Sequence, residues 1–134
     1  MSISEWPAED IYRIAERGRS LHMQGKYPEA IVIFEGLLAA DPQNAYCREA
    51  LAAAWLAMGE PQQAIEQFDT LIRQTPGNLV ARAHRTEAHL QAGNLDAARS
   101  DFEFLRRLLP DSEIRRLELA LETAARKATF FKNP

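Results

Sequence analysis

The chain is a short, mildly acidic sequence of 134 residues with a formal net charge of −3. Hydrophobic residues make up 46% of it and charged residues 26%, a balance typical of soluble globular or repeat proteins. A negative net charge gives no sign of the concentrated basic surface that nucleic-acid binding requires. No apolar run approaches the roughly 20 residues that span a bilayer. A single cysteine, Cys47, and the lack of a signal-peptide pattern favour a reduced, cytoplasmic setting.

One short pattern recurs three times along the chain at a constant interval. The decamers GKYPEAIVIF, GEPQQAIEQF and GNLDAARSDF begin at Gly25, Gly59 and Gly93, which are 34 residues apart. Leucines and prolines follow each decamer in the same register, at Leu37, Leu71, Leu105, Pro42, Pro76 and Pro110. A constant period of this length is typical of proteins built from stacked helical repeats.

The first unit predicts a helix, a tight turn and a second helix. Residues 11–24, IYRIAERGRSLHMQ, carry a helical apolar pattern. The glycine after them predicts a turn, since glycine accepts the left-handed backbone that ends a helix. Beyond the turn, Ala30, Phe34 and Leu37 are spaced by four and three residues, which places them on one helix face. Pro42 then ends the second helix, because proline disfavours helical geometry in the residue before it.

The second and third units repeat this design, with AYCREALAAAWLAM and LVARAHRTEAHLQA as their first helices. The repeats are therefore expected to span about 11–44, 45–78 and 79–112. Gly18 and Ala52, within first helices, are small enough to let two helices approach closely. The aromatic stripe is interpreted as core packing rather than as a cofactor site, and it consists of Phe34, Phe68 and Phe102.

A further helix of about residues 113–131 follows the third repeat. Its apolar stripe comprises Ile114, Leu117, Leu121 and Ala124. A repeat array needs such a capping helix to cover its last open interface. Near its end, Phe130 and Phe131 either fold back on the cap or belong to an interface, and fold-back is favoured. Residues 1–134 are expected to form a single domain.

The period, the small residues, the aromatic stripe and the closing prolines together resemble the tetratricopeptide repeat, or TPR, over residues 11–112. The resemblance implies an all-α fold, a right-handed superhelical array of three helix-turn-helix repeats plus a C-terminal capping helix. Arg48 and Arg82 stand where the family prefers a bulky apolar residue, and Thr86 replaces its usual glycine. We therefore expect the local packing to differ at these three positions.

No group of residues has the spacing of a catalytic or metal site. Cys47 has no histidine close to it in sequence, and we expect it to be buried as a small apolar residue. His84 and His89 would point about 140° apart on a helix, which is poor spacing for metal ligands. The sequence therefore predicts a protein that is not an enzyme, with no catalytic residue, no cofactor and no metal.

In TPR arrays the first helices of successive repeats line a concave groove that binds extended peptides. The family register implies that the groove is lined by Tyr12, Ala15, Arg19, Met23, Tyr46, Glu49, Ala53, Leu56, Ala57, Val80, Ala83, Glu87 and Leu90. Most of these side chains are small or apolar, so the groove would accept an extended segment with spaced apolar side chains. The alternative is that the chain's own end, with Phe130 and Phe131, covers part of this surface.

One TPR class grips the C-terminal carboxylate of heat-shock chaperones with lysine, asparagine and arginine side chains. The matching positions in this chain are Ala15, Arg19, Ala50, Val80 and His84. Four of the five lack the needed donor, and Arg19 alone cannot form the clamp. Capture of a terminal carboxylate is therefore not expected.

The small three-repeat layout also resembles the chaperones that guard translocator subunits in bacterial type III secretion. The stretch EAHLQAGNLDAARSDF, residues 87–102, is the most similar, followed by MQGKYPEAIVIF. The resemblance implies a cytoplasmic chaperone or adaptor that holds an extended apolar stretch of a client protein. In that family a helical segment before the first repeat helps dimerisation, whereas here the first repeat begins after about ten residues. A homodimer is therefore left open.

The alternative function is a structural scaffold subunit of a larger assembly, acting through its convex face or its C-terminal helix. Both functions predict protein partners, and neither involves nucleic acid or membrane insertion. The identity of the client or assembly lies beyond what the residues indicate.

Overall fold

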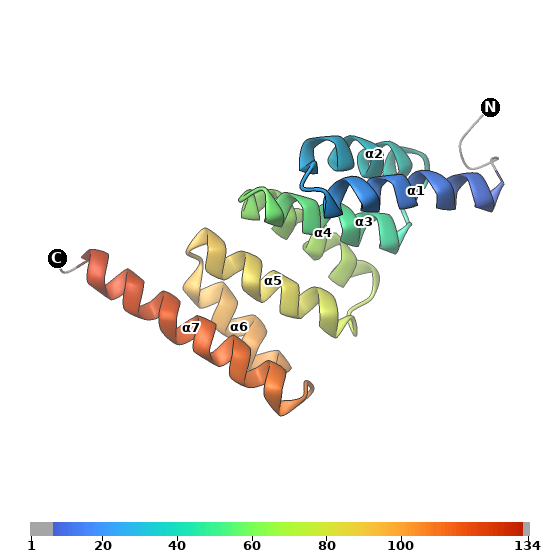
Figure 1. Ribbon diagram of the computed structural model, residues 1–134. Coiled ribbons are helices and arrows are strands. Elements are labelled where there is room, and N and C mark those ends of the chain that lie inside the picture. The colour runs from blue at the N-terminus through green and yellow to red at the C-terminus, as the bar shows by residue number, and fades with distance from the viewer. Residues whose placement is uncertain (1–6, 133–134) are drawn as a thin grey trace. The chain divides into compact units, whose positions relative to one another are not determined.

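The computed structural model describes residues 7–132, which form α-helices joined by short turns (Figure 1). The helices are α1 (Ala8–Met23), α2 (Tyr27–Ala40), α3 (Ala45–Ala57), α4 (Pro61–Gln74), α5 (Leu79–Ala92), α6 (Leu95–Leu105) and α7 (Asp111–Lys132). No strand occurs among these residues. The predicted all-α repeat array is confirmed, with α1, α3 and α5 as first helices, α2, α4 and α6 as second helices, and α7 as the cap.

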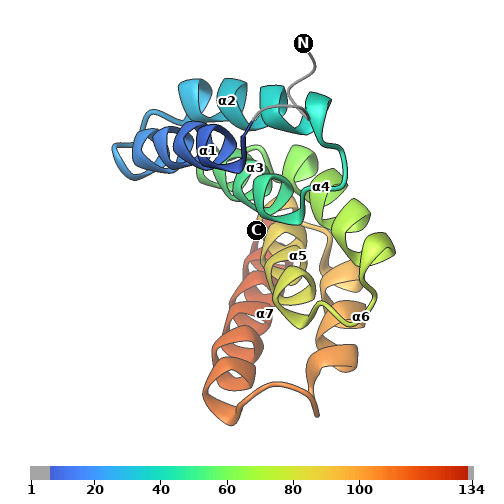
Figure 2. The ribbon, with the colours of Figure 1, turned by 90° about the vertical axis from the view of Figure 1, so that its right-hand side faces the viewer.

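The chain divides into two compact units, Met1–Gln67 and Phe68–Pro134, and the division falls inside α4. In the first unit, α2 packs against both α1 and α3, and α1 also contacts α3. In the second unit, α5 and α6 form a pair and α7 contacts both of them (Figure 2). The expectation that residues 1–134 form one domain stays a prediction.

Glycine forms the turn between the two helices of each repeat. Gly25, Gly59 and Gly93 have φ angles of 77°, 78° and 81°, in the left-handed region that other residues rarely adopt. The turns predicted from the repeat period are thereby confirmed. Pro28 and Pro61 lie in the first turns of α2 and α4, where a missing N–H costs no hydrogen bond.

Two asparagines make the same capping contact at the start of α3 and α5, a feature that the repeat pattern alone did not indicate. Oδ1 of Asn44 accepts a hydrogen bond of 3.0 Å from the backbone N–H of Cys47. Oδ1 of Asn78 accepts one of the same length from Ala81. Each contact satisfies one of the N–H groups that a helix start leaves unpaired, and it is worth about 1 kcal/mol.

The core of the first unit depends on a close approach between α1 and α2. Gly18 of α1 faces Phe34 of α2, and a Cβ atom at Gly18 would lie 2.8 Å from Cζ of Phe34. Phe34 is 1% exposed and belongs to a cluster that also contains Leu37 of α2 and Leu51 of α3. The predicted roles of the small residue and of the aromatic ring as core packing are confirmed here.

The capping helix closes the core of the second unit. Leu117 of α7 is fully buried in a cluster with Ala83 of α5 and with Phe102 and Leu105 of α6. Two more residues of its predicted apolar stripe pack against this cluster. The predicted capping role of α7 is therefore confirmed, although the helix begins two residues earlier than expected.

Phe130 and Phe131 do not fold back on the cap, so the favoured prediction for them is wrong. Their side chains are 68% and 79% exposed. The two rings meet edge to face, with their centroids 5.5 Å apart. The reason is that α7 stays helical through these residues and carries them past the part of the helix that packs on α5 and α6 (Figure 1).

A polar network in the second unit joins α5 to α6 and to the end of α4. Asp101 of α6 is 4% exposed and accepts hydrogen bonds of 2.8 Å and 2.6 Å from Arg85 of α5. Arg85 also donates to Asp69 of α4 at 3.0 Å. The hydrogen bond to Asp101 raises the pKa of Arg85, so this guanidinium stays charged. Beside it, the guanidinium of Arg82 lies 3.9 Å from the ring centroid of Phe104.

Hydrogen bonds replace apolar packing at the other two departures from the family pattern. The buried hydroxyl of Thr86 donates to the backbone oxygen of Arg82 at 2.9 Å. In the first unit, Arg48 donates to Oε1 of Gln67 at 2.7 Å and to the backbone oxygen of Pro42 at 2.8 Å. Hydrogen bonds or a cation–π contact therefore occupy the three positions, Arg48, Thr86 and Arg82, at which the sequence departs from the family pattern.

We expect Gly18→Ala to lower the free energy of unfolding and Gly36→Ala to raise it. Both glycines lie in helices, where alanine is favoured by about 1 kcal/mol. At position 18 the new methyl group would overlap the buried ring of Phe34, which costs about 1–3 kcal/mol. At position 36 nothing lies within 4 Å of the added Cβ. Chemical denaturation measures both variants, and equal stabilisation of the two would contradict the close approach.

We expect Asp101→Ala to destabilise the protein by about 3 kcal/mol, because it removes one carboxylate from the partly buried Arg85. Asp96→Ala is the matched control on the same helix. Asp96 pairs with Arg99 at 3.4 Å, but its side chain is fully exposed, so its removal should change stability little. Thermal and chemical denaturation test the difference, and a comparable loss in the two variants would show that the network does not hold the second unit.

Candidate functional site

Large apolar side chains stand exposed on the first helices of the repeats. Tyr12 and Met23 of α1 are 67% and 74% exposed, Tyr46 of α3 is 50% exposed, and Val80 of α5 is 54% exposed. The second helices expose Val32 and Phe104 to a similar extent. Single exposed apolar residues are ordinary, but their recurrence on α1, α3 and α5 matches the register expected for a binding surface.

In the first unit, α1 and α3 contact each other and bring two tyrosines together. Glu16, Arg19 and Tyr12 of α1 all act electrostatically on Tyr46 of α3. Burial and then the negative charge of Glu16 raise the pKa of Tyr46, so its hydroxyl stays protonated near neutral pH and can donate a hydrogen bond. We call these four residues the tyrosine surface.

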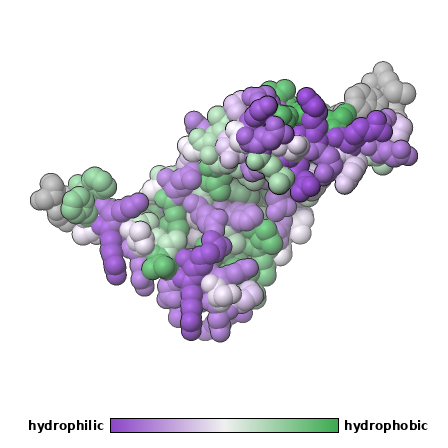
Figure 3. Space-filling model, viewed as in Figure 1, coloured by the Kyte–Doolittle hydropathy of each residue, from purple (hydrophilic) through white to green (hydrophobic). Residues whose placement is uncertain are grey.

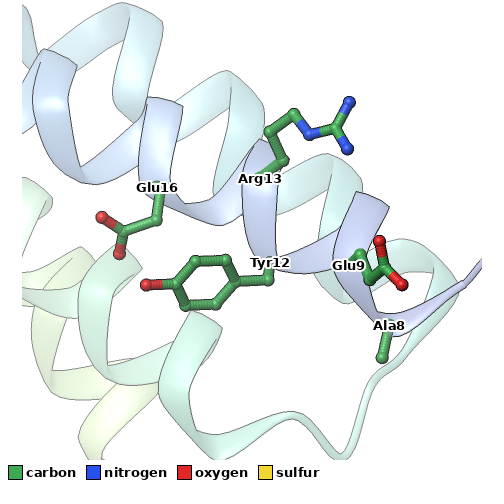
Figure 4. A pocket seen from close by; sticks show the side chains of 5 residues that line it. All are labelled: Ala8, Glu9, Tyr12, Arg13 and Glu16. Carbon is green, nitrogen blue, oxygen red and sulfur yellow. The ribbon is translucent and has the colours of Figure 1, made fainter.

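An open hollow adjoins the tyrosine surface at the start of α1. Its volume is about 590 Å³, and its lining consists of Ala8, Glu9, Tyr12, Arg13 and Glu16 (Figure 4). The side chains of Tyr12 and Glu16 extend toward the same side of α1, whereas Arg13 points away from the ring. An aromatic face beside carboxylates suits an apolar side chain or the stem of a lysine or arginine.

The other residues predicted for the surface of the first unit differ in their exposure. Ala53 and Ala57 of α3 are exposed, and they share the helix face of Tyr46 at intervals of seven and four residues. Glu49 and Leu56 are half-buried on the same helix. Ala15 of α1 was also predicted for the groove, but it is only 5% exposed and belongs to the core cluster.

In the second unit, the capping helix takes part in the predicted surface. Arg116 of α7 forms an ion pair with Glu87 of α5. Ala83 is 7% exposed in the cluster that Leu117 closes. Leu90 lines a hollow of about 470 Å³ together with residues of α7. Of the α5 residues predicted to line the groove, Val80 is therefore the one whose side chain is well exposed. The sequence did not indicate the contacts that α5 makes with α7.

The positions of a carboxylate clamp hold side chains with other contacts. Nε of Arg19 lies 3.3 Å from Oε1 of Glu16, in an exposed pair on α1. The ring of His84 packs on Phe68, with centroids 5.8 Å apart. The remaining matched positions carry alanine or valine, which offer no side-chain donor.

The candidate nucleophile, Cys47, is buried. Cys47 is 1% exposed, as predicted, and burial followed by the charge of Asp41 raises the pKa of its thiol. A buried, protonated thiol is a poor nucleophile. Within residues 7–132, no three His, Cys, Asp or Glu side chains gather as metal ligands would. Over the same range, no helix has the length and apolar character needed to cross a membrane.

Comparison with known families identifies the repeat. A family model described as tetratricopeptide repeat matches residues 21–84 and 56–121, which together cover more than half of the chain. The chain belongs to the tetratricopeptide repeat family. No curated protein sequence matches it significantly.

Several solved structures share the fold. PcrH from Pseudomonas aeruginosa is 23% identical with a TM-score of 0.78, over 93% of this chain and 99% of that chain. The Yersinia enterocolitica type III secretion chaperone SycD, in complex with a peptide of the translocator YopD, is 22% identical with a TM-score of 0.79, over 92% and 98%. The first TPR of Spaghetti (RPAP3), bound to the HSP90 peptide SRMEEVD, is 24% identical with a TM-score of 0.73, over 87% and 96%.

Proposed function

We propose that this chain is a protein-interaction module whose first helices bind an extended apolar segment of a client protein. The observation that carries the proposal is the exposure, within the first unit, of Tyr12 and Met23 on α1 and of Tyr46 on α3. Burying one such side chain contributes about 1.5–3 kcal/mol. Three anchors of this size, offset by the cost of ordering the peptide, suit an affinity in the micromolar range.

The cellular role that we propose is that of a cytoplasmic chaperone or adaptor for a bacterial secretion system. Its support is the structural likeness to SycD with its YopD peptide and to PcrH, which has been solved with the chaperone binding region of PopD. Keeping an apolar client segment covered requires no catalysis. We accordingly propose that the protein is not an enzyme, and the buried thiol of Cys47 supports this.

Capture of a terminal carboxylate, as the HSP90 peptide of the RPAP3 structure would suggest, is not proposed. Arg19 is paired with Glu16, and the other matched positions offer at most the ring of His84 as a donor. The tyrosine surface also carries the negative charge of Glu16, which disfavours a second carboxylate. An internal apolar segment therefore fits these residues better than an acidic chain end.

Affinity purification from the native host tests the proposal most simply. We expect the wild-type protein to retain a client protein. A Tyr12→Glu/Tyr46→Glu variant should retain about tenfold less of that client, because two anchors become charged. Val32→Glu is the matched control, since Val32 is 70% exposed on α2. Quantitative mass spectrometry of the retained proteins gives the measurement.

Fluorescence anisotropy with a labelled peptide of the identified client then separates binding from folding. The control variant should bind that peptide like the wild type. Equal retention by all three proteins, or a loss confined to Val32→Glu, would exclude the first helices as the binding surface. Circular dichroism of each variant ensures that the comparison is made between folded proteins.

A structural scaffold subunit is the second candidate function. Its support is the exposure of Phe130 and Phe131 at the end of α7. A scaffold acting through this end would lose its assembly in a Phe130→Ser/Phe131→Ser variant while the effect of the tyrosine variant on partners would be small. The two functions are therefore separable by the same purification.

A further inference from the structure

We propose that α7 pairs in antiparallel fashion with α7 of a second copy of this chain. The surface concerned, here called the outer face of α7, consists of Leu119, Glu122, Thr123, Arg126 and Phe130. These residues recur at intervals of three and four, so they lie in one sector of the helix. The proposal stands on residues of the capping helix and is independent of client binding by the first helices.

The outer face lies on the exposed side of α7, and two of its members, Leu119 and Thr123, also border the hollow that α7 forms with Leu90 of α5. Leu117 is fully buried on the packed side. All five residues of the outer face are exposed, and Leu119 and Phe130 remain 64% and 68% exposed. They are separated by about 16 Å along the helix, at 1.5 Å per residue. In Figure 3 the surface at the C-terminal end of α7, beside the grey residues, is coloured as hydrophobic.

The order of residues along the outer face fits a two-fold symmetric pair. Leu119 and Phe130 are equally far from the bond between Ala124 and Ala125. A two-fold axis at that point places Leu119 of each copy beside Phe130 of the other copy, so the same contact forms at both ends of the helix pair. Phe131, whose ring contacts Phe130 edge to face, widens the apolar contact at each end. Such a contact is closed by symmetry, because the same patch serves both copies.

The charges on the outer face favour an antiparallel arrangement of the two helices. They also favour a second copy of this chain as the partner. Among the described residues, neither Glu122 nor Arg126 belongs to an ion pair. With the same two-fold axis, Glu122 lies within about 1.5 Å, along the helix, of the level of Arg126 in the other copy. Two ion pairs then form across the axis. A parallel pair would instead set Glu122 against Glu122 and Arg126 against Arg126, which is unfavourable.

Two neighbouring charges lie on the flanks of the outer face. Arg116, on the flank of the outer face, is already held by Glu87 of α5. Lys127 lines the hollow beside Leu90, on the opposite flank from Glu122. One helix pair of this length is a small interface, so we expect a reversible dimer that forms as the concentration rises.

Sedimentation equilibrium of the full chain with paired charge reversals tests the proposal. The wild type should rise from 15.1 kDa toward twice that mass with increasing concentration. Glu122→Arg and Arg126→Glu should each weaken dimerisation at least tenfold, because like charges then meet at the axis. The Glu122→Arg/Arg126→Glu double variant should restore it. An equimolar mixture of the two single variants should form a heterodimer, although neither variant dimerises alone.

Glu35→Arg, an exposed charge reversal on α2 in the other unit, is the matched control and should dimerise like the wild type. All substituted positions are exposed, so circular dichroism should show unchanged helix content. A wild-type chain that stays at 15.1 kDa at several hundred micromolar would overturn the proposal. So would single reversals without effect, or a mixture that fails to associate.

Discussion

The close approach of α1 and α2 at Gly18 and Phe34 is the contact on which the first unit depends. A Cβ at Gly18 would come within 2.8 Å of the ring, so only glycine allows this helix spacing without a shift. The packing of α1 on α2 through Gly18 leaves other residues of α1 exposed. Among them are Tyr12 and Met23, which are 67% and 74% exposed.

The second unit reaches the same architecture with different chemistry. Arg85 and the buried Asp101 join α5 to α6 through two hydrogen bonds. Polar contacts of this kind are directional, and they fix α5 against α6 only if every partner is satisfied. α7 then covers part of α5, so Val80 is the anchor left well exposed. The two units therefore offer unequal surfaces: an open pair of tyrosines in one and a single valine in the other.

The sequence indicated the parts of the structure that repeat. The helices of the repeats, the glycine turns and the aromatic core followed from a 34-residue period, because each feature recurs at a constant position. The cap followed from its own apolar stripe of Ile114, Leu117, Leu121 and Ala124. The contact of Arg85 with Asp101, and that of Arg116 with Glu87, join residues far apart in sequence and occur once, so periodicity carried no signal for them. The fold-back of Phe130 and Phe131 was mispredicted because α7 stays helical through these residues, and this continuity leaves both rings exposed.

Site-specific photo-crosslinking in the native host tests whether the exposed side of the first helices holds a client segment. A photoreactive phenylalanine would replace Tyr46 on α3 or, separately, Val32 on α2, two positions that are 50% and 70% exposed. We expect the label at position 46 to capture one short apolar stretch of a single client, and the label at position 32 not to capture it. Capture of that stretch from position 32, with none from position 46, would contradict it.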